Sequence, residues 1–145
     1  MIDIVLPYPI SANRYWRTYM PKGHHVPVTV VSKEAKAYKE TVQWILASAG
    51  VQEPIDDVIS IRYTLYPRRP KDWMKRMRTD PYGWHRNVQC IDLDNAQKVM
   101  FDAMKGIAFT DDDLVWFICG QRGVPDEKGA RVEVRIRRYS DDEIA

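Results

Sequence analysis

The sequence predicts a single α+β domain over residues 1–145, in which a small mixed β-sheet packs against two main helices. Apolar and polar residues alternate in several separated segments, which is the pattern of strands with one buried face. Two other segments repeat apolar residues at spacings of three and four, as amphipathic helices do. No internal repeat or long linker divides the chain, and its 145 residues are enough to bury a core.

In the first half of the chain, proline, serine and glycine mark the ends of the predicted elements. Pro7 ends the first strand, because proline has no N–H to donate to a sheet. Ser32 is a favoured N-cap residue, and Gly50 a favoured C-terminal residue, for the helix between them. The expected elements are strands over 2–6, 28–31 and 59–66, a polar and aromatic loop over 11–17, and a helix over 33–49.

In the second half, residues 67–90 show no periodicity and contain three prolines, so they predict a long basic and aromatic loop. A helix is expected after Asp94, running to about Lys105. The dense apolar run Leu114–Cys119 predicts a buried strand. A last strand is expected over 131–137, with charged residues on one face.

The composition indicates a globular protein and argues against several classes. The hydrophobic fraction is 45%, the charged fraction is 29% and the net charge is only +2. The two cysteines, Cys90 and Cys119, form no C-x-x-C pattern, so a cysteine-based zinc site is not expected. The sequence has neither an apolar stretch of about 20 residues nor a signal-peptide pattern, so we expect a cytoplasmic protein without a membrane span.

Two groups of aspartates flank the second predicted helix. Asp92 and Asp94 stand just before it, and the run 111–113 (Asp-Asp-Asp) follows it after a short apolar segment. Lys98 lies in its first turns. If the two ends of segment 91–113 meet in space, they form an oxygen-rich pocket beside a cation, which is what a divalent metal and a phosphate need.

Structural interpretations of the same residues are slightly favoured by physical chemistry alone, because an isolated D-x-D is common. Asp94 or Asn95 could cap the helix. Lys98 could pair with Asp94 or Asp102, each four residues away. The run 111–113 could be a solvated turn.

Three separated motifs extend this pattern, and together they resemble the RusA family of Holliday junction resolvases. The resemblance covers nearly the whole chain, with the motifs in the family's order. The motifs are Asp92-Leu93-Asp94-Asn95-x-x-Lys98 with Phe101-Asp102-Ala103-Met104 and Asp111-Asp112-x-x-Val115, then Leu6-Pro7-Tyr8-Pro9-x-Ser11-x-Asn13-Arg14-Tyr15-Trp16-Arg17, and Val31-Ser32-x-Glu34-x-x-Ala37-Tyr38.

The resemblance implies an endonuclease that depends on Mg²⁺, is usually a homodimer and cuts branched DNA with paired nicks, often encoded in a prophage. It implies that Asp92, Asp94 and Asp112 are catalytic and hold the metal, and that Lys98 is a catalytic lysine. Asp111 and Asp113 flank Asp112, and the sequence leaves open which of the three is the third ligand.

The basic residues are the expected contacts to DNA, since Lys and Arg neutralise phosphates. For Arg14, Arg17 and Tyr15 this role is implied by the resemblance. The aromatic residues Trp73, Tyr82 and Trp84 either stack on unpaired bases or fold under the loop. The predicted DNA-binding residues are Arg14, Arg17, Arg68, Arg69, Lys71, Lys75, Arg76 and Arg78.

The sequence therefore predicts a Mg²⁺-dependent endodeoxyribonuclease that resolves Holliday junctions and related branched DNA during recombination and repair. Two alternatives fit the same residues. One is a non-catalytic junction-binding or architectural protein, in which the acidic cluster is structural. The other is a metal nuclease that acts on flapped or single-stranded DNA.

Overall fold

The structure is a computed structural model and describes residues 1–140; residues 141–145, which the predicted single domain includes, lie outside the described residues. Its strands are β1 (Ile2–Pro7), β2 (Trp16–Tyr19), β3 (Val28–Val31), β4 (Ile59–Tyr66), β5 (Val115–Arg122) and β6 (Arg131–Arg138). Its α-helices are α1 (Ala12–Tyr15), α2 (Lys33–Ser48), α3 (Trp73–Thr79) and α4 (Leu93–Met104). Two short 3-10 helices are η1 (Trp84–Asn87) and η2 (Asp112–Leu114).

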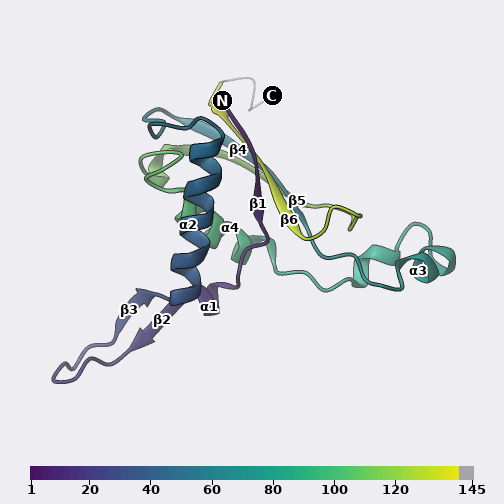
Figure 1. The fold of residues 1–145 in the computed structure, drawn as a ribbon, viewed down its shortest axis with the longest axis horizontal. Coiled ribbons are helices and arrows are strands. Elements are labelled where there is room, and N and C mark those ends of the chain that lie inside the picture. The colour runs from purple at the N-terminus through teal and green to yellow at the C-terminus, as the bar shows by residue number, and fades with distance from the viewer. Residues whose placement is uncertain (141–145) are drawn as a thin grey trace.

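Four strands form a mixed sheet in the order β1-β6-β4-β5, in which only β4 and β5 are parallel. Helices α2 and α4 pack on each other and on one face of this sheet (Figure 1). Alternate strand residues point into the core, as Ile2, Ile4 and Leu6 do in β1. The predicted α+β fold, a small mixed sheet with two main helices, is confirmed.

Both main helices begin and end close to where the sequence predicts. The Oγ of Ser32 accepts a hydrogen bond from the N–H of Ala35 at 3.1 Å, and Gly50, with a φ of 89°, follows the end of α2. Helix α4 covers Leu93–Met104, so it begins two residues earlier than the predicted start after Asp94 and ends one residue before Lys105. None of the helices in residues 1–140 combines the length and the apolar character that crossing a membrane requires.

Two segments project toward opposite ends of the molecule (Figure 1). One is the hairpin of β2 and β3, which pair antiparallel from Trp16 and Val31 to Tyr19 and Val28. The predicted loop over 11–17 is therefore wrong, since α1 and β2 occupy most of it. The other projection, residues 67–90, is called the arm below.

The arm contains α3 and η1, which the prediction of a structureless loop misses. No residue of α3 is buried, so its sequence has no stripe of apolar residues that packs against the core of the domain. Trp84 of η1 is buried within the arm and does not belong to the main core. Its N–H donates to the carbonyl of Asp80 at 3.0 Å, which joins η1 to the end of α3.

Strand β5 is an edge strand, and the prediction of a buried strand over 114–119 is wrong in this respect. The strand covers Val115–Arg122 and, among the strands of residues 1–140, pairs with β4 alone. Trp116 is 64% exposed and Ile118 is 44% exposed. A dense apolar run is buried only where neighbouring elements cover the strand. Here no described strand pairs with the outer edge of β5, so this edge is open.

Candidate active site

Asp92 and Asp94 lie at the start of α4. Their carboxylates are exposed and make few contacts with the described residues. Asp92 is the N-cap residue, but its carboxylate makes no capping hydrogen bond. Asp94 forms no hydrogen bond or ion pair with any residue that the structure describes. Asn95 is not a cap either, because its Oδ1 accepts the N–H of Ala12 at 2.5 Å. Both carboxylates are therefore available to a ligand.

Lys98 lies one turn beyond Asp94 on the exposed side of α4. Side chains four residues apart on a helix are neighbours, with Cβ atoms about 6 Å apart. Among residues 1–140 no acidic side chain pairs with Lys98, and Asp102 instead lies 3.1 Å from Lys39. Lys98 is thus a cation that the fold leaves unpaired beside Asp94.

Two residues distant in sequence fix the segment that leads into α4. The Oη of Tyr8 accepts the N–H of Ile91 at 2.7 Å, and burial raises the pKa of Tyr8. Arg122, at the end of β5, donates to the carbonyls of Cys90 and Ile91 at 3.4 and 3.5 Å. The same guanidinium lies 3.7 Å from Oδ1 of Asp92. These contacts place Asp92 beside the end of the sheet.

Tyr63 of β4 holds the first turns of α4 against the sheet. Its hydroxyl donates to Oε1 of Gln97 at 2.8 Å. Burial, followed by the charge of Asp94, raises the pKa of Tyr63. Gly120 of β5 is needed here, because a Cβ at that position would lie 2.3 Å from the Tyr63 ring. The sheet therefore sets the position of the aspartates at the start of α4.

The second acidic group forms the turn η2. The side chain of Asp111 accepts the N–H of Asp112 at 2.7 Å, so this carboxylate is used within its own turn. The ammonium of Lys105 lies 3.4 Å from Asp112 and 3.5 Å from Asp111. The charge of Asp112, followed by that of Asp111, raises the pKa of Lys105. Asp113 is exposed and has no hydrogen bond or ion pair among the described residues.

Within one chain, the two acidic groups lie at opposite ends of α4. Asp92 precedes the first residue of the helix, whereas Asp112 contacts Lys105, directly after the last. A helix of 12 residues is about 18 Å long, too far for one metal ion to contact both ends. In residues 1–140, no three His, Cys, Asp or Glu side chains lie close enough together to hold a metal. The pocket expected if the ends of segment 91–113 meet is therefore not formed within one chain.

The pair Asp92 and Asp94 nevertheless suits Mg²⁺. This ion prefers oxygen ligands and commonly takes one or two carboxylates from a protein, with water and substrate phosphate filling its other positions. Both carboxylates are exposed, and the one ion pair that they form within residues 1–140, between Asp92 and Arg122, is long at 3.7 Å. The unpaired Lys98 adds a positive charge that can bind an additional phosphate oxygen.

A cleft of about 970 Å³ lies between the base of the arm and the segment that follows β1. Its lining includes Ile91, so the cleft reaches the residue before Asp92. No Asp or Glu of the described part of the chain lines it, and a groove of one charge sign attracts a polyanion. Five of the eight predicted DNA-binding residues line it: Arg14, Arg68, Arg69, Lys71 and Arg76.

The other three predicted DNA-binding residues lie outside this cleft. Arg17 is on β2, where its guanidinium lies 5.4 Å from the ring centre of Tyr19. Lys75 and Arg78 are on α3, where each lines another hollow of the arm. The structure therefore gathers five of the predicted DNA-binding residues around one cleft and leaves the other three outside it.

Tyr15 does not bind phosphate, and that prediction is wrong. Its side chain is fully buried, and its hydroxyl donates to Oδ2 of Asp102 on α4. Burial, followed by this hydrogen bond, raises the pKa of Tyr15. The motif residue thus joins α1 to α4 inside the fold, whereas its neighbour Arg14 is exposed.

Sequence reasoning missed Tyr8 and Arg122. Arg122 lies beyond the predicted strand over 114–119, and it meets Asp92 because β5 is longer than expected and runs parallel to β4. No local pattern connects these two residues. Tyr8 lies within a motif of the family resemblance, and that signal could have found it.

Comparison with known proteins gives one consistent family. Residues 7–137 match the family model described as endodeoxyribonuclease RusA. The chain is 30% identical over 141 residues to the crossover junction endodeoxyribonuclease RusA of Escherichia coli O139:H28 (strain E24377A / ETEC), with 97% of each chain covered. It is 31% identical over 138 residues to the protein of that name from Escherichia coli (strain K12), with 92% of each covered.

A relative of the same name from Enterobacteria phage 82 is 30% identical over 137 residues, which cover 92% of this chain and 91% of that one. The match to the family model and these relatives extend along nearly the whole length of the chain. They confirm the resemblance that the separated motifs indicate. The chain belongs to the RusA family of endodeoxyribonucleases.

Proposed function

We propose that this chain is a Mg²⁺-dependent endodeoxyribonuclease that resolves Holliday junctions in the cytoplasm by paired symmetric nicks, in recombination and repair. One observation carries the proposal: two exposed carboxylates, Asp92 and Asp94, adjoin a cation-lined cleft in a chain of the RusA family. The name of these relatives, crossover junction endodeoxyribonuclease RusA, supports this substrate.

In the proposed mechanism, Asp92 and Asp94 hold the metal and Lys98 binds the scissile phosphate. When bound there, Mg²⁺ would supply a Lewis acid for activating water and would offset phosphate charge. The ammonium of Lys98 stabilises the negative charge that develops on the phosphoryl oxygens. Arg122 fixes the segment ahead of α4 and keeps a second cation beside Asp92. The cations of the cleft hold the strand that leads to this site.

DNA cleavage by the Asp94→Asn variant tests the proposal that Asp94 holds the metal. The substitution removes one carboxylate ligand and keeps its size, so we expect cleavage of a synthetic four-way junction in Mg²⁺ to fall about a thousandfold or more. Junction affinity should change little, because the cleft cations stay in place. Glu40→Gln, which removes an exposed charge on α2, is the matched control and should cleave normally. Undiminished cleavage by Asp94→Asn would end the proposal.

The third carboxylate, in this proposal, comes from a second copy of the chain. One chain cannot bring Asp112 to Asp92, since α4 separates them. A homodimer supplies the missing ligand to both sites at once and sets two sites on opposing strands, as paired nicks require. Asp112 is the ligand we propose, in keeping with the family motif, because the carboxylate of Asp111 is used within its own turn.

The open edge of β5 is the surface we propose for pairing. No described strand pairs with this edge, and Trp116 and Ile118 expose apolar surface along it. Antiparallel pairing of two β5 strands about a two-fold axis sets the start of one strand against the end of the other. Asp112 precedes the start of β5, and Arg122 at its end contacts Asp92. This pairing therefore brings Asp112 of the second copy toward Asp92.

A mixing experiment separates a shared site from a single-chain site. Asp94→Asn and Asp112→Asn are each expected to be inactive alone. In a mixed dimer with shared sites, one site combines both substitutions and the other has neither. Mixing the two inactive variants should therefore restore nicking, of one strand only. If the mixture stays as inactive as its components, the shared site is wrong, while the Asp94→Asn result still tests the nuclease itself.

A further inference from the structure

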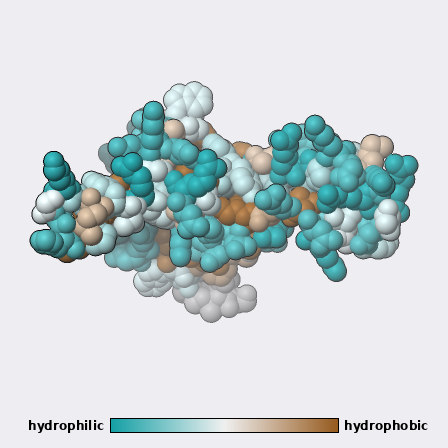
Figure 2. All heavy atoms as spheres, turned by 90° about the horizontal axis from the view of Figure 1, so that it is seen from below, coloured by the Kyte–Doolittle hydropathy of each residue, from teal (hydrophilic) through white to brown (hydrophobic). Residues whose placement is uncertain are grey.

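Helix α3 of the arm turns apolar side chains to solvent. Met74 is 58% exposed and Met77 is 44% exposed. Met77 follows Met74 by three residues and the half-buried Trp73 by four, the spacings at which side chains on a helix are neighbours. These three residues, with Arg78, line a shallow apolar hollow and are called the methionine face below. The arm is otherwise largely hydrophilic, with a small hydrophobic patch toward its outer end (Figure 2, at right).

The arm does not need this face for its own packing. The opposite side of α3 meets η1, where Arg76, Thr79 and Asp80 line a hollow together with Trp84. The buried side chain there is Trp84, supported by the hydrogen bond from its N–H to the carbonyl of Asp80. An exposed apolar face on a helix that is already held on its other side indicates a binding surface.

The charges around the methionine face identify what it binds. The guanidinium of Arg69 lies 4.1 Å from the ring centre of Trp73, and Arg78 borders the hollow itself. The acid directly before α3, Asp72, is engaged elsewhere, since it pairs with Arg76 at 2.9 Å. An apolar face bordered by arginines suits a nucleic acid, in which apolar bases lie between charged phosphates.

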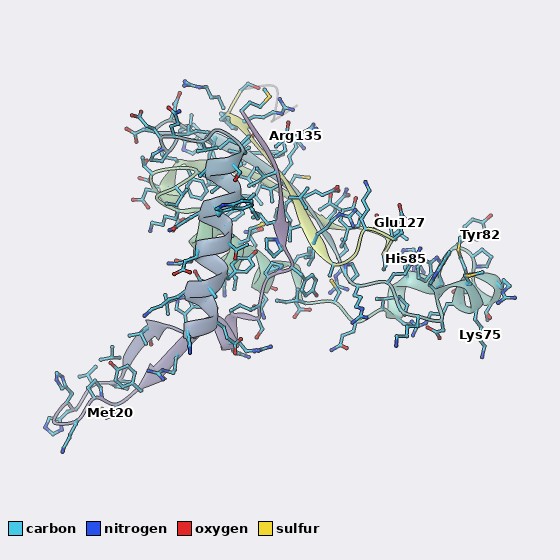
Figure 3. The ribbon with its side chains drawn as sticks, in the orientation of Figure 1. Met20, Lys75, Tyr82, His85, Glu127 and Arg135 are labelled. Atoms are coloured by element: carbon cyan, nitrogen blue, oxygen red, sulfur yellow. The ribbon has the colours of Figure 1, made fainter. Side chains whose placement is uncertain are left out.

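The three aromatic residues of the arm differ in how far their side chains are exposed. Trp84 is buried and Trp73 is partly covered by Arg69, so neither is free to stack on a base without rearrangement. Tyr82 is 89% exposed, and in Figure 3 it points away from the side of the arm on which Lys75 lies. The methionines are thus the apolar side chains that α3 itself presents.

We propose that the methionine face is a wedge that packs against unstacked bases at the branch point of the DNA substrate. Flexible apolar side chains such as Met fill irregular gaps, and apolar side chains of this kind keep base steps open in bent DNA. The wedge stands at the outer end of a segment whose base lines the cationic cleft. The inference rests on the proposed function and adds the residues that recognise branching.

The test uses the full-length chain and a four-way junction with 2-aminopurine at the branch point, whose fluorescence rises when the base unstacks. Binding is measured with Asp94→Asn in every protein, so that the junction stays intact. The variant is Met74→Ser with Met77→Ser, and the conservative counterpart carries Leu at both positions. Met20→Ser is the matched control, because Met20 is 55% exposed at the opposite end of the molecule (Figure 3).

The serine variant should bind the junction but lose the fluorescence rise, and with Asp94 restored it should cleave about tenfold more slowly. The leucine variant and Met20→Ser should keep the rise. An unchanged rise in the serine variant overturns the wedge, and so does an altered oligomeric state, which would assign the face to a second copy. A parent chain that neither binds nor cuts the junction overturns the proposed function and the wedge together.

Discussion

Tyr15 of α1 donates its phenolic hydrogen to Oδ2 of Asp102 on α4, across 87 positions of sequence. The ammonium of Lys39 on α2 lies 3.1 Å from the same oxygen and 6.0 Å from the ring centre of Tyr15. Three helices therefore meet at one carboxylate. Since α4 also carries Asp94, this contact helps to fix the helix on which the proposed active site is built.

Replacing Tyr15 by Phe removes the hydroxyl and keeps the ring in the core. A hydrogen bond to a charged group contributes about 2 kcal/mol, and we expect the free energy of unfolding to fall by about this amount. Urea denaturation followed by circular dichroism measures it. Tyr19→Phe removes an exposed hydroxyl and should change stability little. Equal effects of the two substitutions would show that the contact with Asp102 adds nothing.

Because this phenol is buried, the free energy of unfolding should change with pH in the alkaline range. Burial and Asp102 raise the pKa of Tyr15 above its ordinary value of 10.0, and burial raises that of Tyr38. A raised pKa means that the folded state holds the proton more tightly than the unfolded state, so the contribution is complete below pH 10.0 and declines above it. The free energy of unfolding should fall as the pH rises above about 10, and less steeply in Tyr15→Phe. Identical slopes for the two proteins would contradict this.

The two main helices and most strands could be predicted from the sequence, because their residues pack against one core. Ser32 and Gly50 define the ends of α2 by local chemistry alone. The arm could not be predicted, since α3 buries none of its residues. The edge position of β5 depends on which strand becomes its neighbour, and no local pattern specifies that.

The site could be predicted only in part, for a related reason. Asp92, Asp94 and Lys98 lie within one short segment, so their spacing in the sequence nearly determines their spacing in the fold. The separation of Asp112 from Asp92 depends on the direction of α4 relative to β5, which is a property of the tertiary structure. Arg122 enters the site for the same reason.

Lys98 should act on the rate and not on affinity. It is one cation beside Asp94, with no acidic partner in the described part of the chain, whereas several cations line the cleft. We expect Lys98→Ala to slow cleavage of bound junction about a hundredfold, as loss of one charge-stabilising donor does, with junction affinity changed by less than about twofold. Single-turnover cleavage and gel-shift titration separate the two. Lys36→Ala on α2 is the control, and a pure loss of affinity in Lys98→Ala would refute the role.

Ile118 lies near the middle of β5, close to the two-fold axis of the proposed pairing. Ile118→Glu sets two like charges near each other in the dimer, so we expect a monomer that has lost most of its cleavage. Analytical ultracentrifugation measures the oligomeric state. Val5→Glu changes an exposed apolar residue on β1, at the other edge of the sheet, and should leave the dimer intact. A dimeric and active Ile118→Glu would exclude this edge as the interface.

Binding of DNA in the cleft predicts that junction affinity falls as the salt concentration rises. The steepness of this fall depends on how many cleft cations contact phosphates. Each cation that contacts a phosphate releases about one counterion, so the slope of log affinity against log salt reports how many contacts form. Arg68 and Lys71 line the cleft, and Arg68→Ala with Lys71→Ala should make the slope shallower by about 2. Arg138→Ala removes an exposed arginine that pairs with Asp57, outside the cleft, and should keep the slope of the parent chain. The measurement is a junction titration by fluorescence anisotropy at several salt concentrations. A slope unchanged in the double variant would place the DNA elsewhere, because two contacts cannot be lost without losing their counterions.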